Sequence, residues 1–457
     1  ITRRALTLGA VASQEKTYDG NTAADAAQFR ATLAGVVAGE ENSVSATAAG
    51  AAYNDKNVAR ANTVHYTGVA LTGTGAGNYT IAGTAQGAGT ITRRALTLGG
   101  VMAQSKTYDG NTSADAAQFR ATLAGVVNGE ENSVSATATG AAYNDKNVAR
   151  ANTVRYTGVA LTGTGAGNYT IANTAQGAGA ITRRALTLGA VEAQTKTYDG
   201  TRAADASKFR AGLNHTVAGD DVKAAAAGAA YNDKNVAAAN RIDYTGVALT
   251  GADAGNYTLA AGAAEGAGTI TRRMLTFDGV TVQTKTYDGN TAADASKFRG
   301  ALGNVVKGEE NSVSATATGA AYNDKNVARA NTVHYTGVAL TGTGTANYTI
   351  AGTAQGAGRI TPKQLNLALA GGARFDKTYD GTADVTQSLT KGGNYTLDGF
   401  VGTEGTGIEL SSATGKYTDK NAGADKNVRF DGLRLTGDGA GNYALDKTTL
   451  TGTGTIT

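Results

Sequence analysis

A long internal repeat constrains this chain more than any other feature of its sequence. The string Ile-Thr-Arg-Arg begins at Ile1, Ile91, Ile181 and Ile270, and the variant ITPK begins at Ile360. Such a period predicts a row of small domains, each with its own core. We define repeats 1 to 5 as residues 1–90, 91–180, 181–269, 270–359 and 360–455. Repeats 1 and 2 differ at only 10 of 90 positions, which indicates recent duplication and a function that depends on length.

Three motifs recur in a fixed order inside every repeat. KTYDG begins at Lys16, YNDKN begins at Tyr53, and an Asn-Tyr pair begins at Asn78. Repeat 5 diverges most, with Pro362 and Lys363 in place of the Arg pair and Thr418 in place of an Asn. The residues predicted to be structural are, in repeat 1, Tyr18, Asp19, Gly20, Tyr53, Asp55, Lys56, Asn57, Asn78 and Tyr79.

Short alternating segments predict an all-β fold. Leu6 and Leu8 share one face at a period of two, and Val64 and Tyr66 do the same. The parity changes after Gly68, which predicts a β-bulge there. Asp-Gly and Gly-rich segments supply turns. The segment 21–37 reads as irregular. Repeats of this length with several short strands favour an immunoglobulin-like sandwich or a β-grasp-like domain.

The boundaries between repeats read as strands and not as linkers. GAGTIT at the end of one repeat is followed at once by RRALTL, with no Ser-rich stretch and no run of charges. A shared strand resists bending, so we predict that five domains joined by continuous strands form a rod. Its expected length is about 150 to 220 Å, from roughly 3.3 Å per strand residue.

Composition excludes several classes of protein. The chain has 41 Lys and Arg against 37 Asp and Glu, with the two signs interspersed, so a nucleic-acid partner is not expected. No stretch has the roughly 18 apolar residues of a membrane span. Cys is absent, and the three His residues are His65, His215 and His334. The positions that match His65 in repeats 2 and 3 hold Arg155 and Asp243, so no general base recurs along the array, and we expect no enzyme and no cofactor. The sequence begins at Ile1 with no targeting segment, and we expect it to belong to a longer protein.

Taken together, the motifs resemble the YDG/MBG-type repeats of large bacterial surface adhesins. These repeats occur in filamentous-haemagglutinin-like proteins exported by two-partner secretion, and the resemblance covers nearly the whole chain. It implies an extracellular protein, secreted or attached to the cell surface, that acts in adhesion and biofilm. It also implies an outer-membrane secretion partner and repeats that build a filament.

Pairs of arginines at the repeat boundaries are candidate polyanion contacts. Guanidinium groups bind carboxylates in bidentate fashion, so an acidic exopolysaccharide is a conceivable ligand. The alternative is that they are solvated or pair with the acidic turn at Glu40 and Glu41 and its counterparts, with little effect on stability. These residues are Arg3, Arg4, Arg93, Arg94, Arg183, Arg184, Arg272 and Arg273.

Three further interpretations of the motifs are weaker. Asp19, Asn21, Asn54, Asp55 and Asn57 offer oxygens to Ca²⁺, but no D-x-D-x-D run exists, and Asp and Asn that bond their own turns explain the pattern better. Lys16 or Lys56 beside an Asn suggests an isopeptide bond, although buried Lys is rare. The sequons at Asn78, Asn168, Asn256, Asn347 and Asn394 suggest glycosylation, but an Asn in a tight turn is the simpler explanation.

The leading hypothesis is a structural one, in which the chain is a stiff stalk or filament segment of an adhesin that contacts a host or bacterial cell surface or matrix. The alternative is a multivalent carbohydrate-binding array. Buried Tyr residues favour the stalk, and exposed Tyr residues favour the array.

Overall fold

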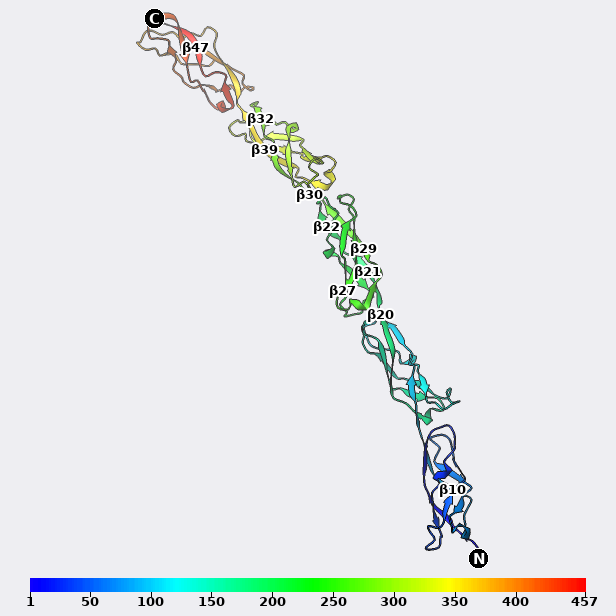
Figure 1. Cartoon of the computed structure of the whole chain (residues 1–457). Helices are drawn as coiled ribbons and strands as arrows, with labels where there is room; N and C mark the ends of the chain where they lie inside the picture. The colour runs from blue at the N-terminus through cyan, green and yellow to red at the C-terminus, as the bar shows by residue number, and fades with distance from the viewer. The chain divides into compact units, whose positions relative to one another are not determined.

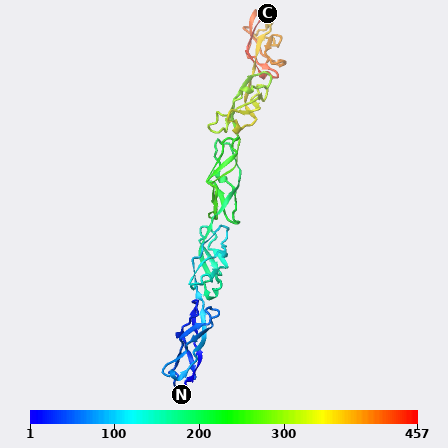
Figure 2. The same ribbon diagram turned by 90° about the vertical axis from the view of Figure 1, so that its right-hand side faces the viewer.

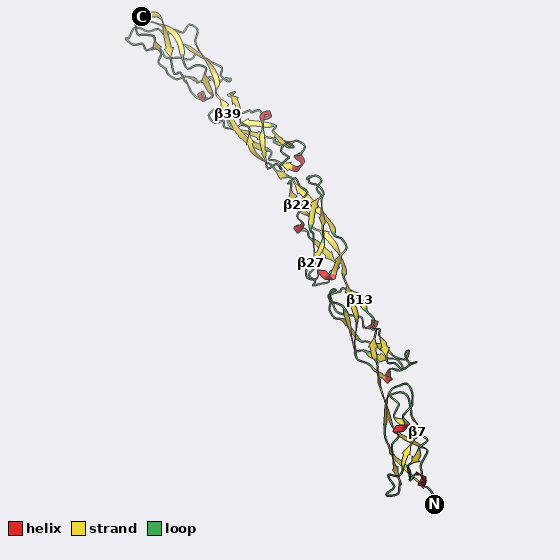
Figure 3. Cartoon of the chain, viewed as in Figure 1, coloured by secondary structure: helices red, strands yellow, loops and turns green.

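The computed structural model describes residues 1–457, and its regular elements are short strands and three-residue 3-10 helices (Figure 3). The predicted all-β class with five repeated domains is confirmed. The helices are single turns between strands, as the isolated red segments show. No helix is long and apolar enough to cross a bilayer.

Repeat 1 gives the plan that repeats 2 to 4 follow, each with strands in the same order. Its elements are β1 Arg4–Ala5, β2 Thr7–Val11, β3 Gln14–Thr17, η1 Ala26–Gln28, β4 Ala31–Ala34, β5 Ser45–Thr47, β6 Gly50–Tyr53, β7 Thr63–Thr67, β8 Ala70–Thr72, η2 Ala76–Asn78, β9 Tyr79–Thr80 and β10 Thr84–Thr92. Repeat 2 contains β11 Arg94–Ala95, β12 Thr97–Gly99, β13 Gln104–Thr107, η3 Ala116–Gln118, β14 Thr122–Ala124, β15 Ser135–Thr137, β16 Gly140–Tyr143, β17 Thr153–Thr157, β18 Ala160–Thr162, η4 Ala166–Asn168, β19 Tyr169–Thr170 and β20 Thr174–Thr182.

Repeats 3 to 5 continue this series, and the colours of Figure 2 lead from one repeat to the next along the chain. Repeat 3 contains β21 Arg184–Val191, β22 Gln194–Thr197, η5 Ala206–Lys208, β23 Ala211–Asn214, β24 Lys223–Ala225, β25 Gly228–Tyr231, β26 Arg241–Thr245, β27 Ala248–Thr250, η6 Ala254–Asn256, β28 Tyr257–Leu259 and β29 Ala263–Thr271. Repeat 4 contains β30 Arg273–Met274, β31 Thr276–Val280, β32 Gln283–Thr286, η7 Ala295–Lys297, β33 Gly300–Gly303, β34 Ser314–Thr316, β35 Gly319–Tyr322, β36 Thr332–Thr336, β37 Ala339–Thr341, η8 Thr345–Asn347, β38 Tyr348–Thr349 and β39 Thr353–Thr361. Repeat 5 contains β40 Lys363–Leu369, β41 Tyr395–Asp398, β42 Glu409–Leu410, β43 Lys416–Tyr417, β44 Gly423–Phe430, β45 Leu435–Thr436, η9 Ala440–Asn442, β46 Tyr443–Leu445 and β47 Leu450–Ile456.

A mixed four-stranded sheet forms one half of each of the first four repeats. In repeat 1 its order is β3-β10-β7-β6, with β3 parallel to β10 and the other pairs antiparallel. Smaller two-stranded pairs, β2-β4, β5-β8 and β1-β9, form the other half. The alternating sequence of β7 matches its position in a sheet with one face on the core, because Val64 and Tyr66 are buried while His65 between them is exposed.

Gly68 does not form the predicted bulge. The strand ends at Thr67, and β8 begins at Ala70 and pairs with β5 in a different sheet, so Gly68 marks a transfer between sheets. Its φ of 62° lies in the left-handed region, and a Cβ there would approach the Cβ of Ala49 to 2.8 Å. The predicted change of side-chain parity is present, but its cause is this turn and not a bulge within one strand.

The segment predicted as irregular contains a short ordered turn. Asp25 caps η1 by accepting a hydrogen bond from the amide of Ala27, and β4 follows at Ala31. Sequence pattern missed the strand because only Leu33 among its four residues is a large apolar residue.

A nearly continuous strand joins each repeat to the next, with a break of one residue. The strands that close repeats 1 to 4 are β10, β20, β29 and β39, all labelled in Figure 1. At the first boundary β10 ends at Thr92 and β11 begins at Arg94, so only Arg93 is outside a strand. The interruption falls where the chain exchanges partners, because β10 pairs within repeat 1 and β11 pairs with β19 of repeat 2.

The structure divides into two compact units whose division runs through repeat 3. Unit 1 comprises residues 1–191, 210–226 and 246–263, and unit 2 comprises residues 192–209, 227–245 and 264–457. Every boundary between consecutive repeats therefore lies inside one unit. The buried clusters follow this division, since Leu96, Val134 and Tyr169 of repeat 2 pack with the core of repeat 1. The hydrophobic cores thus bridge the sequence boundaries.

Candidate functional site at the joints between repeats

The recurrent motifs meet where one repeat contacts the next, a region that we call the joint. At the joint between repeats 1 and 2, the hydroxyl of Tyr18 donates to Oε1 of Glu130 at 2.7 Å. Tyr169 donates to Oε2 of the same carboxylate at 2.8 Å. Nζ of Lys56 lies 3.2 Å from Oε1. One carboxylate thus receives two hydroxyls and one ammonium group from three motifs.

Aromatic packing surrounds this polar cluster. The rings of Tyr18 and Tyr169 contact edge to face with centroids 5.3 Å apart, an arrangement that stabilises aromatic pairs. Gly20 follows the Tyr at a φ of 82°, and a Cβ on it would lie 2.7 Å from Cγ1 of Val127. Glycine is therefore needed at this position for two reasons: it adopts the positive φ of the turn, and it lets the neighbouring repeat approach closely.

An amide from the Asn-Tyr pair completes the joint. Oδ1 of Asn168 accepts a hydrogen bond from the backbone amide of Val58 at 2.9 Å, and its Nδ2 donates to Oδ1 of Asn57 at 3.0 Å. Asn57 is held in turn by Asp55, whose Oδ1 accepts from both the amide and the side chain of Asn57. Asn168 is buried, so the sequon at this position is part of an interface. Sequence pattern suggested only a tight turn.

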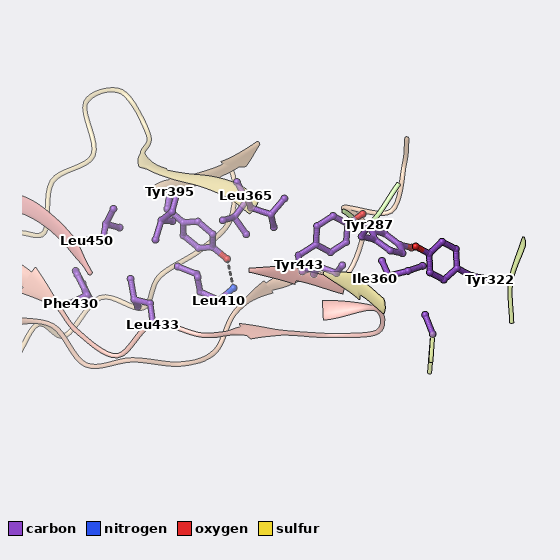
Figure 4. Packing of buried hydrophobic residues seen from close by; sticks show 14 of the residues in the cluster. Tyr287, Tyr322, Ile360, Leu365, Tyr395, Leu410, Phe430, Leu433, Tyr443 and Leu450 are labelled. Carbon is purple, nitrogen blue, oxygen red and sulfur yellow. Dashed lines mark hydrogen bonds between the residues drawn. The ribbon is translucent and has the colours of Figure 1, made fainter. Parts of the chain in front are cut away.

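The tyrosine and asparagine contacts recur at the other three joints, and the Lys contact recurs at two of them, from Lys234 to Glu309 and from Lys325 to Glu404. The acidic residue is Asp220 for Tyr108 and Tyr257, Glu309 for Tyr198 and Tyr348, and Glu404 for Tyr287 and Tyr443. The bridging amides belong to Asn256, Asn347 and Asn442. Figure 4 shows Tyr287 and Tyr443 beside each other within the continuous core that joins repeats 4 and 5.

The cluster shifts the pKa values of its members in opposite directions. Burial opposes ionisation of Glu130, but hydrogen bonds from Tyr18, Tyr169 and Lys56 outweigh it and lower the pKa of the carboxyl group. Burial raises the pKa of Tyr18, and the hydrogen bond to Glu130 raises it further. Burial and a hydrogen bond to the acid of their own joint, Asp220 for Tyr257 and Glu309 for Tyr348, raise the pKa of each of these tyrosines to about 12. At neutral pH the joint therefore contains an ionised carboxylate and neutral tyrosines.

The Arg pairs lie close to the joints but do not make the ion pair considered from sequence. Nε of Arg93 donates to the carbonyl of Gly167 at 3.1 Å, within the 3-10 turn that positions Asn168. Arg183 and Arg272 make the matching bonds to Gly255 and Ala346. Glu130 instead accepts hydrogen bonds from Tyr18, Tyr169 and Lys56. Of the remaining members, Arg94, Arg184 and Arg273 begin strands, and Arg3 and Arg4 are exposed in repeat 1.

The Lys of KTYDG holds its own loop together. Nζ of Lys16 donates to Asp19 at 2.8 Å, to the backbone carbonyl of Asn21 at 2.9 Å and to that of Ala23 at 2.8 Å, and it lies over the ring of Tyr53. In repeats 3 and 5 the counterpart of Asn21 is Thr201 or Thr382, and the Lys bonds are kept. A Thr cannot form an isopeptide bond, so hydrogen bonding explains the position in all five repeats.

The oxygens considered for Ca²⁺ are occupied within their own turns. Asp19 and Asp55 accept from amides two residues further on, and Oδ1 of Asn54 accepts from the amides of Asn62 and Thr63. The bonds of Asp19 and Asp55 are the Asx-turn bonds expected from such sequences, whereas Asn54 closes a longer loop. Of the predicted structural residues in repeat 1, Tyr18, Tyr53 and Tyr79 are buried. Asn78 is exposed, unlike its four counterparts.

Surface grooves occupy different places in different repeats. One lies over Leu6–Val11 and residues 81–86 of repeat 1, another over residues 279–281 and 299–301 of repeat 4, and a third over β43, β44 and β47 of repeat 5. The joint, in contrast, recurs at all four boundaries. It is the feature that the repeated motifs specify.

Fold and joints define a tandem array of small all-β domains. The sequence model of the YDG domain family matches residues 2–87, 92–177, 182–264, 271–356 and 361–450, so the chain belongs to the YDG domain family. This confirms the YDG part of the resemblance stated from sequence. No curated protein matches the chain.

Several solved structures of repetitive β-domain proteins align with long stretches of the chain. The protocadherin GammaB4 extracellular domain is 8% identical, with a TM-score of 0.24, over 100% of this chain and 85% of its own. The human desmocollin-1 ectodomain is 7% identical, with a TM-score of 0.21, over 98% and 97%. Sidekick-1 immunoglobulin domains 1–5 are 8% identical, with a TM-score of 0.22, over 78% and 80%. TM-scores this low establish no shared fold, and no function follows from them.

Proposed function

We propose that the chain is a structural segment, a stalk or filament, of a secreted bacterial surface adhesin, and that it acts through length and stiffness. Support comes from the joints, where residues of KTYDG, YNDKN and the Asn-Tyr pair hold one repeat to the next. A flexible tether needs no such contacts. The recurrent residues pack consecutive repeats against each other, which suits a protein that must hold its repeats in a fixed arrangement along its length.

The location and partners of the stalk are part of this proposal. An extracellular site, export through an outer-membrane partner and contact with a cell surface or exopolysaccharide follow from the resemblance to two-partner secretion adhesins. A chain without Cys suits passage through a pore in an unfolded state. The repeats are the scaffold in this scheme, and we propose that they perform no catalysis.

A multivalent carbohydrate-binding array is the alternative, and the Tyr residues argue against it. Binding by stacking on sugars requires exposed rings, whereas Tyr18, Tyr53, Tyr66 and Tyr79 are each buried in repeat 1. Equilibrium titration with an acidic polysaccharide tests this alternative directly. Saturable binding at several equivalent sites per chain would favour the array.

Small-angle scattering of the full chain tests the stalk. The expected maximum dimension is about 150 to 220 Å, from roughly 3.3 Å per strand residue. A value well under about 120 Å on the same estimate would contradict the proposal. A variant with Ala at Tyr18, Tyr108, Tyr198 and Tyr287 should bend at its joints and show a shorter, broader distance distribution. Tyr379→Ala, which lies outside the four joints, is the control and should match the parent chain.

A further inference from the structure

The joint between repeats 2 and 3 lacks a contact that the other three joints have. In those three, the Lys of YNDKN lies 3.2, 3.4 and 3.4 Å from the acid of the next repeat. The Lys at the same place in repeat 2, Lys146, forms no ion pair with the acid of repeat 3, Asp220. This joint is therefore held by two hydroxyls where the others have two hydroxyls and an ammonium group.

The missing contact has its cause in the length of one side chain. The acid is Glu at three joints and Asp220 at this one, so its side chain is shorter by one methylene group. Tyr108 and Tyr257 both donate to the same oxygen, Oδ2, at 2.8 and 2.6 Å. At the joint between repeats 1 and 2, the two hydroxyls bind separate oxygens of Glu130, and one of these oxygens also accepts from Lys56. The shorter acid holds both tyrosines but does not reach the lysine.

The turn that presents the acid is shorter in repeat 3 and has lost its internal bonds. Three residues separate Glu130 from Val134 in repeat 2, whereas one residue separates Asp220 from Val222. The lost residues include a Ser, whose Oγ donates to the carbonyl of the acid in repeats 1, 2 and 4. In the same three repeats, the second acid of the turn accepts from the amide of the Gly that precedes the pair. Neither bond is present in repeat 3, so Asp220 is less firmly held.

An additional carboxylate lies beside this joint. Asp253 stands at the position of Gly165 in repeat 2, and its Oδ2 accepts from the amide of Asp221 at 2.9 Å. A Cβ on Gly165 would lie 2.5 Å from Oγ of Ser133, so Asp253 occupies space that the Ser fills in the other repeats. Burial is the main cause that raises the pKa of Tyr108, and the charge of Asp253 adds to it. Repeat 3 thus brings more negative charge to the joint where the neutralising ion pair is missing, and like charges repel.

The remaining contacts of this joint match those of the others. The rings of Tyr108 and Tyr257 meet edge to face with centroids 5.3 Å apart, the same distance as at the first joint. Oδ1 of Asn256 accepts from the amide of Val148 at 2.9 Å, and a Cβ on Gly110 would lie 2.7 Å from Cγ1 of the next repeat's Val. The joint is formed, and what distinguishes it is the acid and the turn around it.

We propose that the joint between repeats 2 and 3 is a built-in weak point of the array, which opens more readily than the other three joints. Loss of a partly exposed ion pair shifts such an equilibrium by about 1.5- to 5-fold, and the unsupported turn and the repulsion between carboxylates act in the same direction. One weaker joint gives a row of firmly joined repeats a defined place to yield under load. The inference goes beyond the proposed stalk, because it follows from the joint contacts alone.

Hydrogen exchange of the full chain, followed at single amides, provides the test. Each joint has its own reporter, because the amide of the Val that follows YNDKN donates to the bridging Asn of the next repeat. All four reporters are preceded by Asn and followed by Ala, so they share one rate in an unfolded chain; they are Val58, Val148, Val236 and Val327. Val148 should exchange at least about threefold faster than the other three. The amides of Ala61 and Ala151, which bond within their own repeats, are the control and should exchange at equal rates.

Two conservative substitutions exchange the acids of two joints. Asp220→Glu should let Lys146 reach the carboxylate and should slow Val148 toward the rate of Val58. Glu130→Asp should speed Val58 by about threefold and leave Val148 unchanged. Adding Lys146→Met to Asp220→Glu should remove the gain, whereas Lys146→Met alone should leave Val148 unchanged, since the parent chain has no such ion pair to lose.

Equal exchange at all four reporters, or slower exchange at Val148, would overturn the proposal. The same holds if Asp220→Glu leaves Val148 as fast as in the parent chain while Ala151 is unaffected, or if the gain survives Lys146→Met. Should Asp220→Glu fail to fold, Glu130→Asp decides, because an unchanged rate at Val58 would show that the length of the acid does not set the strength of a joint. Scattering of the parent chain tests the stalk separately, so the two proposals can fail independently.

Discussion

Tyr18 in repeat 1 donates a hydrogen bond to Glu130 in repeat 2, across 112 residues of sequence, and the same carboxylate also binds Tyr169 of its own repeat. A single acidic side chain therefore ties a recurrent motif of one repeat to a recurrent motif of the next. The arrangement explains why the motifs recur together, because each is one part of a contact that spans two repeats.

Removing the charge of this carboxylate should loosen one joint. Glu130→Gln keeps the shape but replaces an ionised acceptor of two hydroxyls, and we expect a loss of about 1.5 to 3 kcal/mol in the stability of that joint. Hydrogen exchange at the amide of Val58, which binds Asn168 in the same joint, should report the change. Glu131→Gln is the matched control, since Glu131 accepts only from the nearby amide of Gly129. Equal effects from both substitutions would contradict a role specific to Glu130.

Two tyrosines of the same motif should respond very differently to truncation. Tyr18→Ala removes a ring that is 1% exposed and should cost about 3 to 5 kcal/mol. Tyr379→Ala removes a ring that is 52% exposed and should change stability by no more than about 0.5 kcal/mol. Urea unfolding of both variants checks the contrast. Similar losses would show that the Tyr stabilises its own repeat and not the joint.

Much of the fold was predictable because its signals are local. The period, the strands around Leu6 and Val64, and the strand that crosses each boundary follow from alternation and from missing linker residues. The error at Gly68 has a physical cause, since a change in side-chain parity looks the same for a bulge and for a move between sheets. The recurrence of Tyr18 in KTYDG predicts a structural residue, and the ring is buried.

The joint itself was not predictable from one repeat. Glu130 and Asn168 contact residues of the preceding repeat. Because every motif occurs again one repeat later, the sequence does not show whether a motif contacts its partner in its own repeat or in the neighbouring one. One available signal was that the acidic turn of the next repeat follows each of the first four KTYDG motifs, at Glu130, Asp220, Glu309 and Glu404. From the motifs alone, the arginines are either solvated or paired with the acidic turns of repeats 1 to 4, and neither alternative points to the tyrosines.

Acid should weaken the joints that contain Glu. The pKa values of Glu130, Glu309 and Glu404 are lowered in the folded protein, since hydrogen bonds from Tyr and Lys outweigh the burial that opposes ionisation. The stabilisation is therefore complete above the ordinary Glu pKa of about 4.3 and is lost as the pH falls through the lowered values. Urea unfolding from pH 7 down to about pH 3 should show this loss. The triple Gln variant should show a flatter dependence.

Alkali should act on the tyrosines of the joints. The pKa values of Tyr257 and Tyr348 are raised to about 12, first by burial and then by bonds to an acidic group. Stability from these neutral hydroxyls is complete below the ordinary Tyr pKa of about 10 and is lost as the pH rises through 12. Absorbance of tyrosinate during a pH titration should show these ionisations late, together with unfolding. Normal titration of all buried tyrosines would contradict the proposed arrangement.

Two glycines of one motif separate the backbone requirement from the packing requirement. Gly20 and Gly381 have nearly the same positive φ, 82° and 80°, so an Ala at either position meets the same conformational strain, about 1 kcal/mol. Only at Gly20 would the added Cβ lie 2.7 Å from Cγ1 of Val127 in the next repeat, while the space around Gly381 is open. Gly20→Ala should therefore cost more than Gly381→Ala by about 1 to 3 kcal/mol, the usual effect of overpacking.

A second substitution makes this test specific to the joint. Val127→Ala removes the methyl groups that the new Cβ would meet, so it should recover part of the stability lost in Gly20→Ala. The double-mutant cycle, measured by urea unfolding, should give an interaction energy of at least about 0.5 kcal/mol in the direction of rescue. Additive losses, or equal costs at Gly20 and Gly381, would mean that the glycine is required only for its backbone conformation and that repeats 1 and 2 do not pack against each other at this point.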